Sequence, residues 1–220
     1  MKKQFLALLG IFAMNSIVIA DEIQTQPKAM EAEKNSVSKN KGEGEGEGEG
    51  ESVASFRKAA DQGDAKAQVK LGIAYAKGEG IVKDEAQAVV WFRKAADQGD
   101  AKAQVNLGNM YAEGKGITRD EAEAVTWYRK AADQGDAKAQ YNLGIAYATG
   151  EGIVNDDVQA VVWFRKAAEQ GLADAQYNLG VAYAEGKGIT KDEAQAVEWF
   201  RRAAEQGDLD AQANLLLLSK

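Results

Sequence analysis

The sequence predicts an all-α fold made from a repeated pair of helices, and three observations support this. The first is a period of 36 residues. A tripeptide that begins with Gln-Gly recurs at this interval, at 62–64, 98–100, 134–136, 170–172 and 206–208. The second is that 27 of 36 positions are identical between segments 56–91 and 92–127. The third is a lack of strand signals, since no alternating run of β-branched residues occurs and no proline lies within the repeats.

The first helix of each unit is predicted from an apolar stripe. Ala67, Leu71, Ala74 and Tyr75 recur at i, i+4, i+7 and i+8, which is the period of a helix with one buried face. Asp64 stands directly before this stripe, where its carboxylate can accept a free backbone N–H of the first turn. We therefore expect a helix to begin after Asp64 and at the same place in each later copy.

The second helix is predicted to begin after Asp84. Asp84 and Gln87 have the three-residue spacing of an N-cap and its capping-box partner. The apolar face that follows consists of Ala88, Trp91, Phe92, Ala95 and Ala96. Gly63 and its copies stand directly after the second helix of successive units, where a left-handed backbone favours glycine.

A Gly-x-Gly motif joins the two helices, at 78–80, 114–116, 150–152 and 186–188. A dinucleotide-binding fingerprint needs a preceding strand and a third glycine, and this motif has neither. We interpret it as a turn in which the first glycine ends one helix and the second reverses the backbone, so that the following isoleucine packs between the helices. The middle residue alternates between acid and base, so stacked copies would align opposite charges along one rim, at Glu79, Lys115, Glu151 and Lys187.

The composition excludes several classes of function. The 220 residues include no cysteine and no histidine, which removes thiol and imidazole catalysis and the usual zinc and haem ligands. There are 27 Lys and Arg residues against 34 Asp and Glu residues, and the resulting net charge of −7 argues against a nucleic-acid partner. No catalytic residue, cofactor or metal site is expected, because the carboxylates fall on the repeated helix caps.

Residues 1–20 are predicted to form a cleaved signal peptide. Lys2 and Lys3 precede an apolar run, and Val18-Ile19-Ala20 fits a cleavage site. The alternative, an uncleaved anchor, is less favoured because the run is shorter than the ~20 residues that span a bilayer. No cysteine follows the run, so a bacterial lipid anchor is not expected. The mature protein is therefore expected in the periplasm or outside the cell.

Residues 21–51 are predicted to be a disordered acidic linker rich in glycine and glutamate. Alternating Gly and Glu offers no apolar face to offset the entropy lost on ordering. Residues 36–39 fit the Ser-x-x-Lys signature of penicillin-binding proteins. That signature requires a rigid helix start within a cleft, so here we interpret it as chance.

Residues 139–171, AQYNLGIAYATGEGIVNDDVQAVVWFRKAAEQG, closely resemble the Sel1-like repeat, a relative of the tetratricopeptide repeat. The shared elements are A-Q-x-N-L-G, a Tyr four residues after the Leu, the Gly-x-Gly turn, and W-[FY]-x-K-A-A-x-Q-G. The resemblance covers residues 52–220, as about four full repeats plus a C-terminal capping helix. It implies a right-handed superhelical α-solenoid of antiparallel hairpins that acts as a scaffold for protein contacts. The first copy departs from the pattern, with Ser55 in place of Trp and Lys70 in place of Asn.

In superhelices of this kind the first helix of each repeat lines the concave side. The resemblance therefore implies a groove floored by positions that vary between copies, with Tyr141 and Tyr177 toward its C-terminal half. Packing of these tyrosines between helices is an equally weighted alternative, and the asparagines are expected to hydrogen-bond a neighbouring turn. The candidate partner-binding residues are Val69, Lys70, Ile73, Val105, Asn106, Asn109, Tyr141, Asn142, Ile145, Tyr177, Asn178 and Val181.

Two functions remain open. The favoured one is a periplasmic or secreted, non-catalytic adaptor that binds a protein or peptide in the groove. The alternative is a hydrolase or binder of cell-wall or β-lactam-like compounds, prompted by cysteine-rich Sel1-like relatives whose cysteines this chain lacks. The run Leu215–Leu218 covers every side of a helix, so it either caps the stack or offers a patch for a partner or a second copy.

Overall fold

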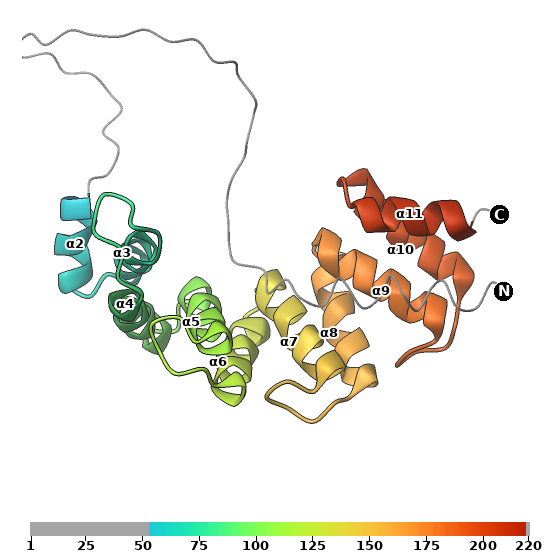
Figure 1. Cartoon of the computed structure of the whole chain (residues 1–220), viewed down its shortest axis with the longest axis horizontal. Helices are drawn as coiled ribbons and strands as arrows, with labels where there is room; N and C mark the ends of the chain where they lie inside the picture. Colours follow the sequence, from blue (N-terminus) through green and yellow to red (C-terminus); the bar gives the residue numbers. More distant parts are fainter. Residues whose placement is uncertain (1–52, 219–220) are drawn as a thin grey trace, which may run out of the picture.

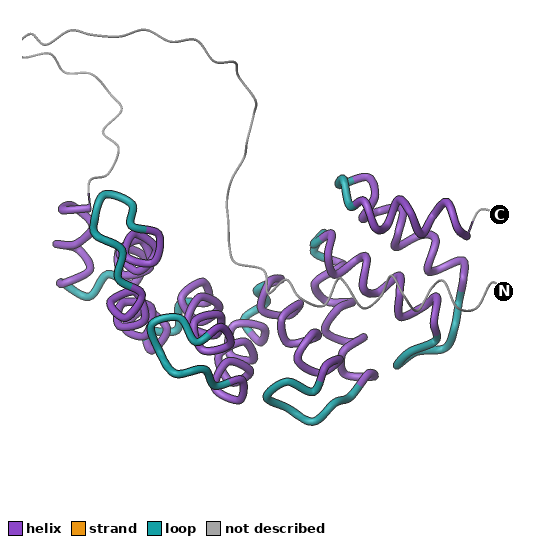
Figure 2. The backbone as a smooth tube through the Cα atoms, viewed as in Figure 1, coloured by secondary structure: helices purple, strands orange, loops and turns teal. Residues whose placement is uncertain are grey.

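The computed structural model describes residues 53–218 and folds them into ten helices, with no strand in that range (Figures 1 and 2). The all-α prediction is therefore confirmed. The predicted signal peptide and acidic linker lie outside the described residues. The helices are α2 (Val53–Asp61), α3 (Ala65–Lys77), α4 (Glu85–Asp97), α5 (Ala101–Glu113), α6 (Glu121–Asp133), α7 (Ala137–Thr149), α8 (Asp157–Glu169), α9 (Ala173–Glu185), α10 (Glu193–Glu205) and α11 (Leu209–Leu218).

The helices form a solenoid in which each one packs against its neighbours along the chain. The hairpins are α3/α4, α5/α6, α7/α8 and α9/α10, with α2 before them and α11 after them. In Figure 1 they follow one another along a curved row from α2 to α11. Stability in such an array comes from each hairpin and from its junctions with the next one.

The predicted caps set the ends of the helices. The carboxylate of Asp64 accepts the backbone N–H of Ala67 at 2.6 Å, and that of Asp84 accepts the N–H of Gln87 at 3.0 Å. Gly78 ends α3 in the left-handed region, at φ 78°. Helix α9 differs from the other first helices, because Leu172 occupies its N-cap and supplies no side-chain hydrogen bond.

The core of each hairpin depends on a glycine within its first helix. Gly108 on α5 lies under the ring of Tyr128 on α6, and a Cβ at this glycine would lie 2.6 Å from Tyr128 Cε1. The same close approach recurs at Gly72, Gly144 and Gly180, each against a Phe ring. An alanine would enter the space of the ring, so glycine allows the two helices to pack this closely.

The tryptophans pack at the junctions between hairpins. Trp127 on α6 belongs to the cluster that contains Val69, Phe92 and Leu107 from the preceding helices. The Lys130 ammonium lies 3.7 Å from the centre of the Trp127 ring, in a cation–π contact. The second helix of one repeat therefore packs against the core of the repeat before it.

Buried glutamines also connect successive repeats. Gln104 Nε2 donates to the carbonyl of Ala96 at 3.2 Å, and Gln134 Nε2 donates to Gln104 Oε1 at 2.8 Å. Gln68, Gln140 and Gln176 make the same pair of contacts. Each buried amide thus satisfies a helix-terminal carbonyl and accepts a bond from the next C-cap, which fixes the register of the stack.

The charged middle residues of the Gly-x-Gly turns form no ion pairs with one another within residues 53–218. Lys115 pairs with Glu113 in its own turn, and Lys187 pairs with Asp157 at 3.2 Å. Within residues 53–218 neither lysine forms an ion pair with Glu79 or Glu151. The reason is proximity, because each lysine reaches a carboxylate beside its own turn or at the start of the preceding second helix.

The leucine run of α11 divides between core and solvent. Leu215 and Leu218 pack against the C-terminal core cluster. Leu216 and Leu217 are exposed to 67% and 42%. The helix therefore covers the end of the stack with one side and leaves apolar surface on the other.

Candidate functional site

The first helices carry one stripe at equivalent positions, which we call the inner stripe. It is largely exposed on α3, whereas Asn109, Asn142 and Asn214 are buried within it on later helices. On α3 it contains Lys66, Lys70, Ile73 and Lys77, at i, i+4, i+7 and i+11. The equivalent positions are 102, 106, 109 and 113 on α5, and so on at intervals of 36 residues. Position 69 lies off this stripe, between neighbouring helices.

Six of the predicted groove residues are buried: Asn109 and Asn142 are 5 and 4% exposed, and the other four are apolar or aromatic core residues. Val69, Val105, Tyr141 and Tyr177 are only 7, 2, 3 and 3% exposed. The rings of Tyr141 and Phe164 lie 5.9 Å apart, and those of Tyr177 and Phe200 lie 5.7 Å apart. Packing therefore accounts for the two tyrosine rings, and burial raises the pKa of both hydroxyls.

The asparagine column bonds the preceding first helix and not a neighbouring turn, which corrects the sequence-based expectation. Asn178 Nδ2 donates to the Tyr141 hydroxyl at 3.2 Å, and Asn214 Nδ2 donates to the Tyr177 hydroxyl at 3.4 Å. Asn142 faces Val105, which has no hydroxyl, and its Nδ2 donates instead to Asn109 Oδ1 at 3.2 Å. The hydrogen-bond partner of each asparagine thus depends on the residue that the previous copy has at the position equivalent to Val69.

Asn106 differs from the other members of this column. On α3, Val69 stands where Tyr141 stands on α7, and it offers no hydroxyl to Asn106. Ile73 stands where Asn109 stands on α5, and it offers no amide oxygen. Within residues 53–218 the Asn106 side chain makes no hydrogen bond, and it is only partly buried. Its amide is therefore available to an incoming polar group.

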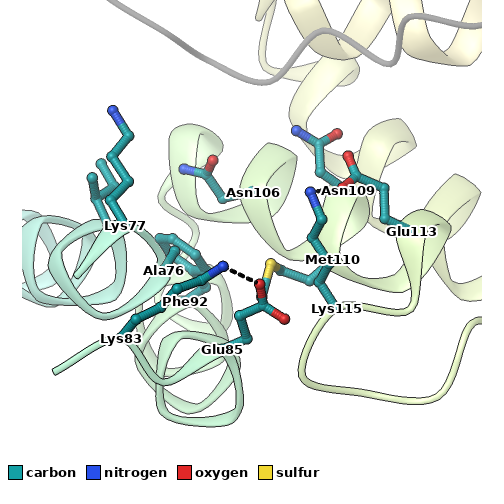
Figure 3. Close-up of a pocket in the computed structure, with 11 residues that line it drawn as sticks. Ala76, Lys77, Lys83, Glu85, Phe92, Asn106, Asn109, Met110, Glu113 and Lys115 are labelled. Atoms are coloured by element: carbon teal, nitrogen blue, oxygen red, sulfur yellow. Dashed lines mark ion pairs between the residues drawn. The ribbon is translucent and has the colours of Figure 1, made fainter.

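A hollow of about 250 Å³ lies beside Asn106, between α3 and α5 (Figure 3). We call it the α3–α5 hollow. Phe92 and Met110 form its apolar floor, and Ile73 and Ala76 form a wall. Its charged rim and polar lining consist of Lys77, Lys83, Glu85, Asn106, Asn109, Glu113 and Lys115. Its size is below the range of small-molecule pockets, so it fits a single partner side chain.

The corresponding space one repeat later is nearly filled. Only about 30 Å³ remains beside Tyr128 and Asn142, between α5 and α7. There the Tyr128 hydroxyl donates to Asn109 Oδ1 at 2.8 Å, and Asn142 donates to the same oxygen. Between α3 and α5, Phe92 replaces Tyr128 and has no hydroxyl, and Ile73 replaces Asn109 and has no acceptor oxygen. This network therefore cannot form there, and the hollow stays open.

The rim of the hollow carries both charges. Lys83 Nζ lies 2.8 Å from Glu85 Oε1, and Lys115 pairs with Glu113. The hydrogen bond that Lys115 donates to the Glu113 carboxylate raises the pKa of Lys115, and the charge of Glu85 adds to this effect.

Of the remaining predicted residues, Ile145 lines the smaller space beside Tyr128. Asn178 and Val181 are half-buried on α9, and Lys70 is exposed on α3. Sequence reasoning did not identify Phe92, Met110 or the rim charges. A usable signal was present, because Phe92 and Ile73 change together to Tyr128 and Asn109 in the next copy.

Two other features bear on the chemistry of the described residues. In residues 53–218 no three His, Cys, Asp or Glu side chains gather as a set of metal ligands. No helix in the same range is long and apolar enough to cross a membrane.

These observations define an α-solenoid with a side-chain-sized hollow on its inner stripe. The Sel1 repeat model matches residues 56–64, 65–100, 101–136, 137–172 and 173–208. The chain belongs to the Sel1 repeat family, whose solenoids are generally non-catalytic scaffolds for protein interaction. The comparison with curated proteins gave no match.

The solved structures that are similar to this chain include two at 40% identity or more. One is c5321, a protective antigen of uropathogenic Escherichia coli with an SLR fold, at 45% identity and a TM-score of 0.73 over 74% of this chain and 35% of that one. The other is a Sel1 repeat protein from Oxalobacter formigenes, at 40% identity and a TM-score of 0.70 over 76% and 48%. The chain therefore spans between a third and a half of the length of these relatives.

Proposed function

We propose that this protein is a secreted or periplasmic scaffold that binds an extended peptide segment of a partner protein along its inner stripe. The observation that carries the proposal is the α3–α5 hollow, which combines an apolar floor with the unbonded amide of Asn106. An apolar side chain of the partner enters the hollow, and its backbone hydrogen-bonds Asn106. Buried apolar anchors with a few directed polar contacts dominate binding energy in such interfaces.

The test is peptide binding by the full chain. Extended peptides are selected from a displayed library, and the affinity of a selected peptide is measured by fluorescence anisotropy. The double variant Phe92→Tyr/Ile73→Asn copies the pair found one repeat later and closes the hollow without a foreign side chain. We expect it to bind at least about tenfold more weakly, since one lost anchor is worth roughly 1.4 kcal/mol or more.

The matched control is Val90→Thr, which also copies the next repeat but changes an exposed position on α4, away from the hollow. We expect it to bind like the wild type. Equal affinity of the double variant and the control, or a library that yields no binder, would contradict the proposal. A Tyr141/Tyr177 double alanine variant is a poor test, because both side chains are core residues and their loss would unfold the C-terminal repeats.

The export part of the proposal is supported by Lys2, Lys3 and the apolar run that follows them. Cell fractionation followed by N-terminal sequencing tests it, and a periplasmic or secreted product that begins at Asp21 is expected. A cytoplasmic product that retains Met1 would contradict it. The hydrolase alternative is tested by nitrocefin turnover, which we expect to be absent.

A further inference from the structure

The inner stripe carries opposite charges at its two ends. The first turns of α3, α5 and α7 hold Lys66, Lys102 and Lys138, and the same position holds Asp174 on α9 and Asp210 on α11. Lys70 and Lys77 add positive charge on α3, and Glu113 on α5 and Glu185 on α9 each add one negative charge. The stripe therefore changes from basic to acidic along the solenoid, although the repeats are otherwise nearly identical.

Helix stability does not account for the three first-turn lysines. The N-terminus of a helix is the positive end of its dipole, so a lysine there is unfavourable and an acid is favourable. Within residues 53–218 none of Lys66, Lys102 and Lys138 forms an ion pair. These ammonium groups are therefore free to meet carboxylates of a partner.

The acidic end of the inner stripe has carboxylates that lack a basic partner. Burial raises the pKa of the Asp174 carboxyl, and the nearby Asp208 raises it further. No Lys or Arg pairs with Asp174, Asp208 or Asp210 in the described part of the chain. Burial raises the pKa of the Tyr177 hydroxyl most, and the charges of Asp210, Asp208 and Glu185 raise it further. A cation from a partner would relieve their repulsion.

We propose that the inner stripe selects an extended partner segment by charge order, with the acidic end of the segment over α3 and α5 and the basic end over α9 and α11. This rests on the proposed function, and it adds the orientation and charge of the segment. The apolar anchor lies nearer the acidic end, because the α3–α5 hollow lies at the basic end of the stripe. Packed helices lie about 10 Å apart and extended residues rise ~3.3 Å, so a segment of roughly 12 residues reaches from α3 to α11.

Orientation is measured directly with a labelled probe. The chain has no cysteine, so Gln62→Cys or Leu209→Cys allows a single fluorophore to be attached at one end of the stripe. The probe is a peptide of about 12 residues with a glutamate block, a leucine and a lysine block, and a quencher on the glutamate end. We expect several-fold stronger quenching of the dye at position 62 than of the dye at position 209. Moving the quencher to the lysine end should invert this ratio.

Charge exchange provides a second test. Lys66→Glu/Lys102→Glu and Asp174→Lys/Asp210→Lys should each weaken probe binding about tenfold or more at low salt, with a smaller loss at high salt. The four changes together should restore binding and reverse the quenching pattern. The matched control is Asp97→Lys/Glu205→Lys, which makes the same change in net charge as Asp174→Lys/Asp210→Lys at exposed ends of α4 and α10. It should bind the probe like the wild type.

The outcomes separate this inference from the proposed function. Binding that depends on the α3–α5 hollow, but shows equal quenching at both positions, overturns the charge order and leaves the scaffold role intact. Failure of any peptide to bind overturns both. Light scattering would overturn the proposal of a partner segment if the wild type self-associates and either double charge variant abolishes that self-association, because a second copy would then fill the stripe. Charge variants that do not change probe binding by the full chain overturn it as well.

Discussion

Gly116 lies against the backbone of Glu85, at the start of the second helix of the preceding repeat. A Cβ at Gly116 would overlap the carbonyl group of Glu85, and the same is true for Gly152 against Glu121 and Gly188 against Asp157. The second glycine of each Gly-x-Gly turn is therefore a contact between repeats, in addition to a bend with φ near 65° at Gly116. This contact explains why glycine is required there.

Gly116→Ala should lower the free energy of unfolding by about 3 kcal/mol or more, because it combines left-handed strain with a backbone clash. The control is Gly135→Ala, at φ 94° with no atom within 4 Å of a Cβ. Strain alone should cost this control about 1–2 kcal/mol. Urea unfolding followed by circular dichroism measures both, and equal losses would show that the contact with Glu85 contributes nothing.

Trp127→Ala should cost about 3–5 kcal/mol, since it empties a buried junction between two repeats. Glu79→Ala should change the stability by less than about 0.5 kcal/mol, because this side chain is exposed. Thermal melting by circular dichroism compares the two variants. A similar drop in Tm for both would refute the assignment of Trp127 to the core.

Gln104→Ala should cost about 1–3 kcal/mol, because it removes two hydrogen bonds between successive repeats, one from Gln104 to the Ala96 carbonyl and one from Gln134 to Gln104. Gln62→Ala is the matched control, at the position equivalent to Gln134 but with no such partner among residues 53–218. Chemical unfolding of both variants checks the difference. If Gln62→Ala is as costly as Gln104→Ala, the glutamine ladder does not hold the repeats together.

Asp174→Asn should stabilise the protein at neutral pH. The folded-state pKa of Asp174 is raised above its ordinary value of 3.8 by burial and by Asp208, so its ionised form destabilises the fold. As pH rises from below 3.8 through the raised pKa, the wild type loses stability relative to the variant. Urea unfolding from pH 3 to pH 7 should therefore show the gap widening with pH, with Asp97→Asn at an exposed position as the control variant.

The repeat pattern made the helices, caps and junction tryptophans predictable, because each of these features recurs. Asp64, Asp84 and Gly63 could be assigned from one copy and checked against the others. Tyr141 could not be placed, because it varies between copies as surface residues do, and its burial depends on the helix of the next repeat. The α3–α5 hollow depends on which side chains meet across a junction, which helical period alone does not specify.

The glutamine and glycine contacts that recur at the junctions have a consequence for how this protein can change over time. Recombination between copies would add or remove 36 residues while every glutamine and glycine contact at the junctions is rebuilt. Each such event would move the basic and acidic ends of the inner stripe apart or together by about 10 Å, or roughly three residues of an extended chain. Copy number would then set the length of ligand that the scaffold can hold, without any change to the residues that hold it.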